Sequence, residues 1–185
     1  MTASNWEAFE QRLSIEEQLY ADSEVLAWPP PSSLLQRLAE RNTNTLATLA
    51  ALEERRADHG DDDNPLMQEI LRMDAKLTAL VEIVNQQLAP ASAFPPRSAL
   101  RFNAVGAVLP KALVPQGDGG LLLRMRFDAC RSLPLELAAR VSRALDENRS
   151  FVEFVIQNDA TSDALERLVF RHHRRKVAGT RQQAG

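Results

Sequence analysis

The sequence changes its periodicity at residues 90–96, which read Pro-Ala-Ser-Ala-Phe-Pro-Pro. Ahead of this segment, apolar residues recur at steps of three or four, which is typical of helices that bury one face. After it, they form short alternating or continuous runs between turn signals, which is typical of strands. Because proline continues neither a helix nor a central strand, the segment predicts a stiff linker. We therefore expect an α+β chain in which helices precede a small antiparallel barrel or sandwich.

The charge balance changes at the same place. Residues 1–96 contain 7 Lys and Arg against 16 Asp and Glu, whereas residues 97–185 contain 15 against 9. A hydrophobic content of 44% and a charged content of 25% are those of a soluble globular protein. No run of 18 apolar residues occurs and no signal-peptide pattern opens the chain, so we expect a cytoplasmic protein without membrane insertion. The single Cys130 excludes an intrachain disulfide.

Two capping boxes, in which Ser is followed three residues later by Glu or Gln, mark the first predicted helix starts. The box at Ser14 predicts a short helix to about Ala21, within an N-terminal segment of residues 1–31. The box at Ser33 predicts a longer helix over about residues 33–57.

A third predicted helix begins at Asn64 and Pro65, where an Asn cap precedes Pro at the first helical position. The acidic residues 58–64 lack the alternating ligand spacing of an EF-hand loop, so we interpret them as one helix end and the next helix start. The second and third helices make up a predicted helical, coiled-coil oligomerisation region over residues 32–90.

The third helix carries an apolar heptad seam, which is typical of a coiled coil. Further apolar residues flank the seam toward its end, so we expect more than two helices to meet there and favour a homotetramer over a trimer or dimer. The predicted oligomer interface consists of Leu66, Ile70, Met73, Leu77, Leu80, Val81, Val84 and Leu88. The alternative is that Val81, Ile83 and Leu88 cover the chain's own helix over residues 33–57.

Strand-like segments follow the linker and are separated by turn signals. They cover residues 99–109, 121–127, 133–145 and 151–156, with a turn at Asn103–Gly106 in the first. The third segment has the composition of a helix, and only its place between strands predicts a strand. An amphipathic helix then runs from a cap at Thr161 and Ser162 to about Lys176, with Leu165, Leu168 and Val169 as its apolar face. A flexible tail over residues 177–185 is expected after it.

The order of these elements resembles the PilZ domain, a six-stranded antiparallel barrel that serves bacteria as a cyclic di-GMP receptor. The resemblance covers about residues 97–176 and is carried by Gly106 and by the stretches over residues 117–127, 151–156 and 164–171. With a helical seam in front, the chain is most similar to atypical, helix-bearing PilZ proteins that self-assemble as tetramers through heptads. The resemblance implies a non-catalytic regulatory protein of the cyclic di-GMP network, which governs pili, motility or virulence.

Family members hold the nucleotide with an R-x-x-x-R motif ahead of the barrel and a (D/N)-x-S-x-x-G motif on an early strand. Here Gly106 matches the Gly, Asn103 stands at the Ser position, and Arg101 replaces an acceptor with an obligate donor. Arg97 completes an R-x-x-x-R only with that same Arg101. We interpret these four residues as a degenerate ligand site and expect no orthodox cyclic di-GMP binding. A receptor with a non-standard site is the alternative.

Other function classes have less support. No catalytic, metal-binding or cofactor motif is present, and the adjacent His172 and His173 point about 100° apart on a helix, so they do not chelate one metal. We therefore expect no enzyme, no metal and no cofactor.

The basic C-terminal helix, with Arg171, Arg174 and Arg175, is a candidate patch for partner proteins, which we expect to be signalling or pilus-related. Binding of nucleic acid by this helix and a small barrel is a further alternative. Against this alternative, the predicted barrel lacks the interleaved aromatic residues that stack bases.

Overall fold

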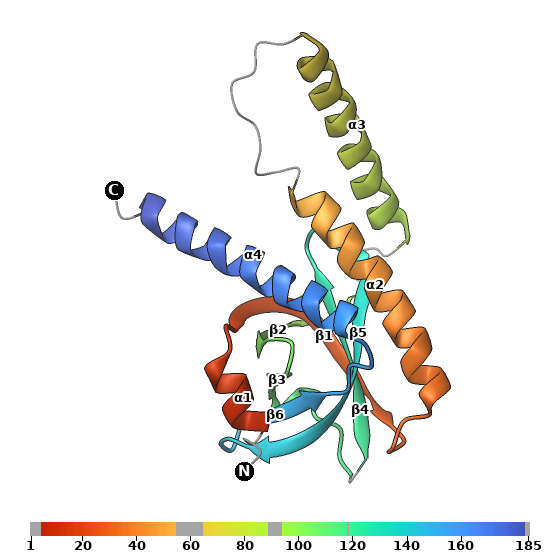
Figure 1. The fold of residues 1–185 in the computed structure, drawn as a ribbon, viewed down its shortest axis with the longest axis vertical. Helices are drawn as coiled ribbons and strands as arrows, with labels where there is room; N and C mark the ends of the chain where they lie inside the picture. The colour runs from red at the N-terminus through yellow and green to blue at the C-terminus, as the bar shows by residue number, and fades with distance from the viewer. Residues whose placement is uncertain (1–4, 55–64, 89–93, 118, 184–185) are drawn as a thin grey trace.

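The structure, a computed structural model, describes residues 5–54, 65–88, 94–117 and 119–183. Its helices are α1 (Asn5–Gln11), α2 (Ser32–Glu54), α3 (Pro65–Leu88) and α4 (Asp159–Gln183), with a short 3-10 helix, η2 (Lys111–Leu113). Its strands are β1 (Ile15–Leu26), β2 (Arg97–Phe102), β3 (Gly106–Pro110), β4 (Gly120–Phe127), β5 (Cys130–Ala144) and β6 (Arg149–Phe154). Figure 1 shows that the strands form a barrel, that α4 crosses one end of it, and that α3 extends away from it.

The barrel is closed, with its strands in the order β1-β2-β3-β6-β5-β4 and each neighbouring pair antiparallel. The predicted six-stranded barrel followed by a C-terminal helix is therefore confirmed. The long β1 makes this closure possible, because its first half pairs with β2 and its second half with β4. Because the barrel is closed, each of the six described strands is paired on both sides and none is an edge strand.

The short helix predicted from Ser14 to about Ala21 is wrong, because these residues begin β1. Ser14 caps no helix, and its hydroxyl accepts a hydrogen bond from Arg101 at 2.9 Å. Ile15, Leu19 and Ala21 face the barrel core and are buried. The local capping signal is outweighed by the ladder hydrogen bonds and apolar burial that β1 gains between β2 and β4. The barrel thus includes a strand from the N-terminal segment and is not confined to residues 97–176.

Two helices complete the barrel core. The C-terminal half of α2 and the first half of α4 bury leucines against residues from the strands. The leucines are Leu46 and Leu49 of α2 and Leu165 and Leu168 of α4. The N-terminal half of α2 instead packs on the outer side of β4 and β5, where Leu35 and Leu38 contact Leu122 and Ala138. The predicted apolar face of α4 is confirmed, since Leu165, Leu168 and Val169 are all buried.

Asn42 fixes α2 to β5 at the point between these two contacts. Its side-chain amide donates to the carbonyl oxygen of Glu136 at 2.7 Å and accepts from the backbone N–H of the same residue at 2.9 Å. A buried side chain therefore satisfies both backbone groups of one strand residue, as a neighbouring strand would.

The limits of α4 differ from those expected. The helix begins at Asp159, and the side chain of Asn158 accepts a hydrogen bond from the backbone N–H of Thr161 at 2.7 Å. Asn158 is thus the N-cap in place of Thr161 and Ser162. The helix continues to Gln183, so most of the expected flexible tail is helical.

The helices predicted over residues 33–57 and from Pro65 are confirmed as α2 and α3, and the strand over residues 133–145 is confirmed within β5. The acidic residues 58–64 lie outside the described residues. Among the described helices, none is long and apolar enough to cross a membrane.

Candidate functional site

The β2–β3 turn holds Asn103 in a structural role. Its buried side chain donates to the carbonyl oxygen of Phe9 at 2.9 Å and accepts from the backbone N–H of Val105 at 2.8 Å. Its own backbone N–H donates to the carbonyl oxygen of Gly106 at 3.1 Å. The side chain therefore shapes the turn and ties it to α1, and both ends of the amide are used.

Gly106 is required by the packing of β3 on β6. A Cβ atom at this position would overlap the carbonyl oxygen of Val152 and lie 2.7 Å from the ring of Phe151. The close approach of two backbones explains the glycine without any ligand.

The two arginines of β2 lie at opposite ends of the strand, on its outer face. Arg101 forms an ion pair with Glu10 at 2.8 Å. Arg97 forms one with Asp128 at 2.6 Å, and its guanidinium lies 4.3 Å from the centroid of the Tyr20 ring. Four strand residues span about 13 Å, so the two arginines lie far apart along β2, and each is already paired with a carboxylate of the chain. The structure does not bring the four residues of the degenerate motif together around one open anion site.

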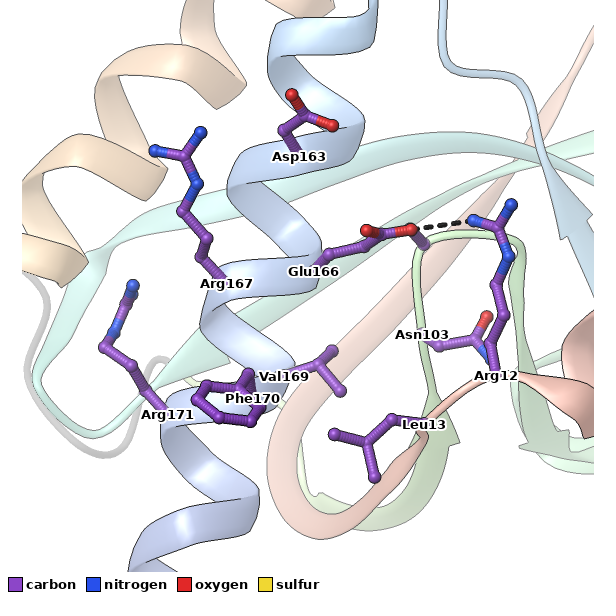
Figure 2. Close-up of a pocket in the computed structure, with 10 residues that line it drawn as sticks. Arg12, Leu13, Asn103, Asp163, Glu166, Arg167, Val169, Phe170 and Arg171 are labelled. Carbon is purple, nitrogen blue, oxygen red and sulfur yellow. Dashed lines mark hydrogen bonds and ion pairs between the residues drawn. The ribbon is translucent and has the colours of Figure 1, made fainter.

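An open groove of about 850 Å³ lies beside the β2–β3 turn (Figure 2). One side is formed by the connection between α1 and β1 together with the turn, and the other by α4. Its lining residues are Arg12, Leu13, Asn103 and Ala104 on the first side, and Asp163, Glu166, Arg167, Val169, Phe170 and Arg171 on α4. An ion pair of 2.7 Å between Arg12 and Glu166 joins the two sides. Sequence reasoning missed this groove, although Phe170 was a signal, since it is an aromatic residue beside the apolar face of α4.

The basic residues of α4 that were predicted to bind partners have mainly intrachain contacts. Arg171 pairs with the carboxylate of Glu53 at 3.2 Å, and Arg175 lies 3.5 Å from the same carboxylate. Arg174 has its guanidinium 5.9 Å from the centroid of the Phe170 ring. Two of the three residues therefore hold α2 and α4 together, and Arg174 is left on the exposed face.

His172 lies in the same contact and bridges α2 and β1. Its Nδ1 is 2.6 Å from Glu17 Oε1, and its Nε2 is 2.6 Å from Glu53 Oε1. Because a carboxylate faces each ring nitrogen, the ring must donate from both and is therefore charged. Burial lowers the pKa of His172, but the hydrogen bonds that it donates to Glu17 and Glu53 outweigh this effect and raise the pKa to about 9.

Glu53 is the acidic centre of this cluster and is only 3% exposed. Burial raises its pKa, but the hydrogen bond and charge of His172, the charge of Arg175 and the hydrogen bond from Arg171 together lower the pKa below its ordinary value of 4.5. The cluster of Glu17, Glu53, Arg171, His172 and Arg175 is called the α2–α4 charge cluster below. Its ion pairs join α2, α4 and β1 within the chain, which is a structural role. No pattern in the sequence indicated these contacts, and His172 was considered there only as a metal ligand.

The heptad face of α3 is uncovered. The described seam and flanking residues are between 36% and 57% exposed: Ile70, Met73, Leu77, Leu80, Val81, Ile83 and Val84. Val81 and Ile83 therefore do not cover α2 within the chain, which argues against that alternative. The side chains of Leu66 and Leu88 lie outside the described part of the structure. Among the described residues, no group of His, Cys, Asp or Glu is placed to hold a metal ion.

Comparison with known proteins agrees with this architecture. A closed six-stranded barrel with a C-terminal helix across one end defines the chain as a PilZ-type barrel protein. Residues 46–182 match the family described as "Atypical PilZ domain, cyclic di-GMP receptor", and the chain belongs to this family. PilZ domains are regulatory binding domains. The match begins inside α2 and so leaves out β1.

A solved structure is similar over nearly the whole chain. It is a pathogenic protein from Xanthomonas campestris, described as a new tetrameric PilZ domain that is self-assembled via a helical bundle. The TM-score is 0.67 and the sequence identity 25%, covering 92% of this chain and 93% of that one. No curated protein matches the chain.

Proposed function

We propose that this protein is a non-catalytic regulator in the cyclic di-GMP network, assembled as a homotetramer through α3 and acting through contacts with other proteins. The observation that carries the proposal is the exposed heptad face of α3. Full burial of one large apolar side chain contributes roughly 1.5–3 kcal/mol, so a face of seven half-exposed side chains is a strong drive to associate. The similar X. campestris protein, described as a helical-bundle tetramer, supports the same geometry here.

Analytical ultracentrifugation tests the assembly. At micromolar concentration we expect a species of four times the 20.6 kDa chain mass. Replacing Leu77 and Leu80 by Asp should give the 20.6 kDa monomer, with an unchanged barrel by circular dichroism. Val177→Asp, which places the same charge on an exposed apolar position of α4, is the matched control and should remain tetrameric. A 20.6 kDa mass for the unmodified protein would refute the assembly.

Binding of cyclic di-GMP at a non-standard site is the second candidate. It is favoured by the position of the groove, which lies beside the β2–β3 turn and has arginines on both of its sides. Against it, Arg12, Arg171 and the Asn103 amide are each occupied by partners within the chain. We therefore expect calorimetry to show no affinity for cyclic di-GMP tighter than roughly the high micromolar range. A low-micromolar affinity that Arg101→Ala abolishes would overturn this expectation and restore the receptor function.

A further inference from the structure

The groove beside α4 contains an apolar surface that the fold itself does not need. Its base is formed by Ala104 and Val169, which are buried, and its two sides by Leu13 and Phe170. Leu13 is 43% exposed and Phe170 is 53% exposed, although Val169, beside it in the chain, is fully packed in the core. A large aromatic side chain at the mouth of a groove is the kind of residue that supplies binding energy in protein interfaces.

The α4 side of the groove is cationic in its C-terminal part, whereas Asp163 and Glu166 lie at its N-terminal end. From Arg167 to the end of α4 at Gln183 the sequence contains no acidic residue. In the described part of the chain, Arg167 and Arg174 have no carboxylate partner, and both are exposed. They stand three residues before and four residues after Phe170, so the three side chains share one helix face. Figure 2 places Arg167 and Arg171 on the far side of Phe170 from Arg12 and Leu13.

We propose that this groove binds an acidic peptide segment of a partner protein. An aliphatic or aromatic anchor of the peptide inserts between Leu13 and Phe170, and carboxylates next to that anchor pair with Arg167 and Arg174. Arg167 lines the groove, and Arg174 lies outside the lining but beside the ring of Phe170. Neither guanidinium group is paired with a carboxylate of the described chain, so both are available to an acidic partner. The inference rests on the proposed action through protein contacts and names the chemistry of the partner.

A peptide fits this groove better than a nucleotide. Asn103, the polar side chain placed to read a base edge, has its amide N–H and its carbonyl oxygen occupied by Phe9 and Val105. Arg12 and Arg171, which would hold phosphates, are paired with Glu166 and Glu53. What remains available is an apolar mouth with flanking cations, which suits an apolar side chain followed by carboxylates.

A peptide-display selection tests the inference without knowledge of the partner. A random 12-residue library is selected on the unmodified full chain, with counter-selection on Phe170→Ser, and the enriched peptides are synthesised for fluorescence anisotropy. We expect the enriched sequences to combine one large apolar residue with two or more Asp or Glu. Phe170→Ser and Arg167→Glu should each weaken their binding at least tenfold. Val25→Ser and Arg37→Glu, matched changes at exposed positions of β1 and α2, should leave it within twofold.

Three outcomes would overturn the inference: no enrichment over the counter-selected variant, enriched peptides that lack acidic residues, or binding that both groove variants leave intact. Displacement of the peptides by micromolar cyclic di-GMP would likewise assign the groove to a nucleotide. Because Phe170 and Arg167 are exposed, both variants should fold, and circular dichroism checks this. The mass of the unmodified protein separates the two proposals. An unmodified tetramer that enriches no peptide contradicts docking alone, and an unmodified monomer that binds the acidic peptides contradicts assembly alone.

Discussion

The barrel and α3 differ in how much of their apolar surface a single chain buries. In the barrel every strand has two neighbours, and α2 and α4 are attached to it by leucines, by Asn42 and by the α2–α4 charge cluster. On α3 the described seam residues remain about half exposed, and the helix contacts the barrel at β5. The comparison shows that one chain is sufficient to complete the barrel, whereas the apolar face of α3 is left exposed in a single chain, as the proposed assembly requires.

The first way to test this comparison is to disturb the barrel where two backbones approach each other. Gly106→Ala places a Cβ against the carbonyl oxygen of Val152, a backbone atom that cannot turn aside as a side chain can. We expect a loss of about 3 kcal/mol in the free energy of unfolding, measured with urea in the Leu77→Asp, Leu80→Asp background so that dissociation does not enter.

Gly179→Ala is the control for this substitution, because nothing lies within 4 Å of a Cβ at that position. It should leave the stability unchanged or increase it by up to about 1 kcal/mol, since alanine is the better helix former. Equal stability of the Gly106 variant and the parent would show that the barrel tolerates a looser β3–β6 contact.

The second test uses the pH dependence of the α2–α4 charge cluster. The pKa of His172 is about 9 in the folded protein, above its ordinary 6.5, so its contribution is fully present below pH 6.5 and is lost as pH rises through 9. The lowered pKa of Glu53 acts in the other direction, and its contribution is lost only as pH falls below 4.5. Urea unfolding should therefore show a plateau in the free energy of unfolding between pH 4.5 and pH 6.5 and a decrease of up to about 3 kcal/mol as pH rises to 9 and above.

His172→Gln is the matched variant, because it can still form hydrogen bonds but does not titrate. The alkaline decrease should be absent in it, whereas His173→Gln should retain the decrease. An NMR titration that gives His172 its ordinary pKa of 6.5 would contradict the cluster as described.

The third test removes the connection between α2 and β5. Asn42→Ala leaves the backbone N–H and carbonyl of Glu136 without their side-chain partner in a buried position. We expect a loss of about 2 kcal/mol in the free energy of unfolding. Thr43→Ala, next to it on the exposed side of α2, should change the stability by less than about 0.5 kcal/mol. Similar values for the two variants would mean that α2 is held by its leucines alone.

The smallest effect on the barrel should come from α3. Ile83→Ser removes an exposed apolar side chain that contributes to no core of the single chain, so barrel stability in the monomeric background should change by less than about 0.5 kcal/mol. In the unmodified protein the same change should shift the sedimentation profile toward smaller species at low concentration. A marked loss of barrel stability would show that α3 belongs to the core after all.

Local patterns in the sequence determined the elements whose signal lies within a few neighbouring residues. The heptad repeat predicted α3, the capping box at Ser33 predicted α2, and alternating apolar runs predicted β4 and β6. The apolar face of α4 followed from its helical period. In each case the periodicity of buried residues is fixed by the geometry of the element itself, so one segment carries its own information.

The tertiary structure alone decided features that depend on residues far apart in the chain. Ile15 begins a strand because β2, some 80 residues later, offers it an antiparallel edge, and the register pairs it with Phe102. His172 is charged because folding brings it to Glu17 and Glu53, which are 155 and 119 residues away. The polar groups of the degenerate motif could likewise be judged only when their partners, Glu10, Phe9 and Asp128, were in place. Strand pairing and the pKa of a buried group both depend on which atoms come within a few ångströms, and no local pattern encodes that.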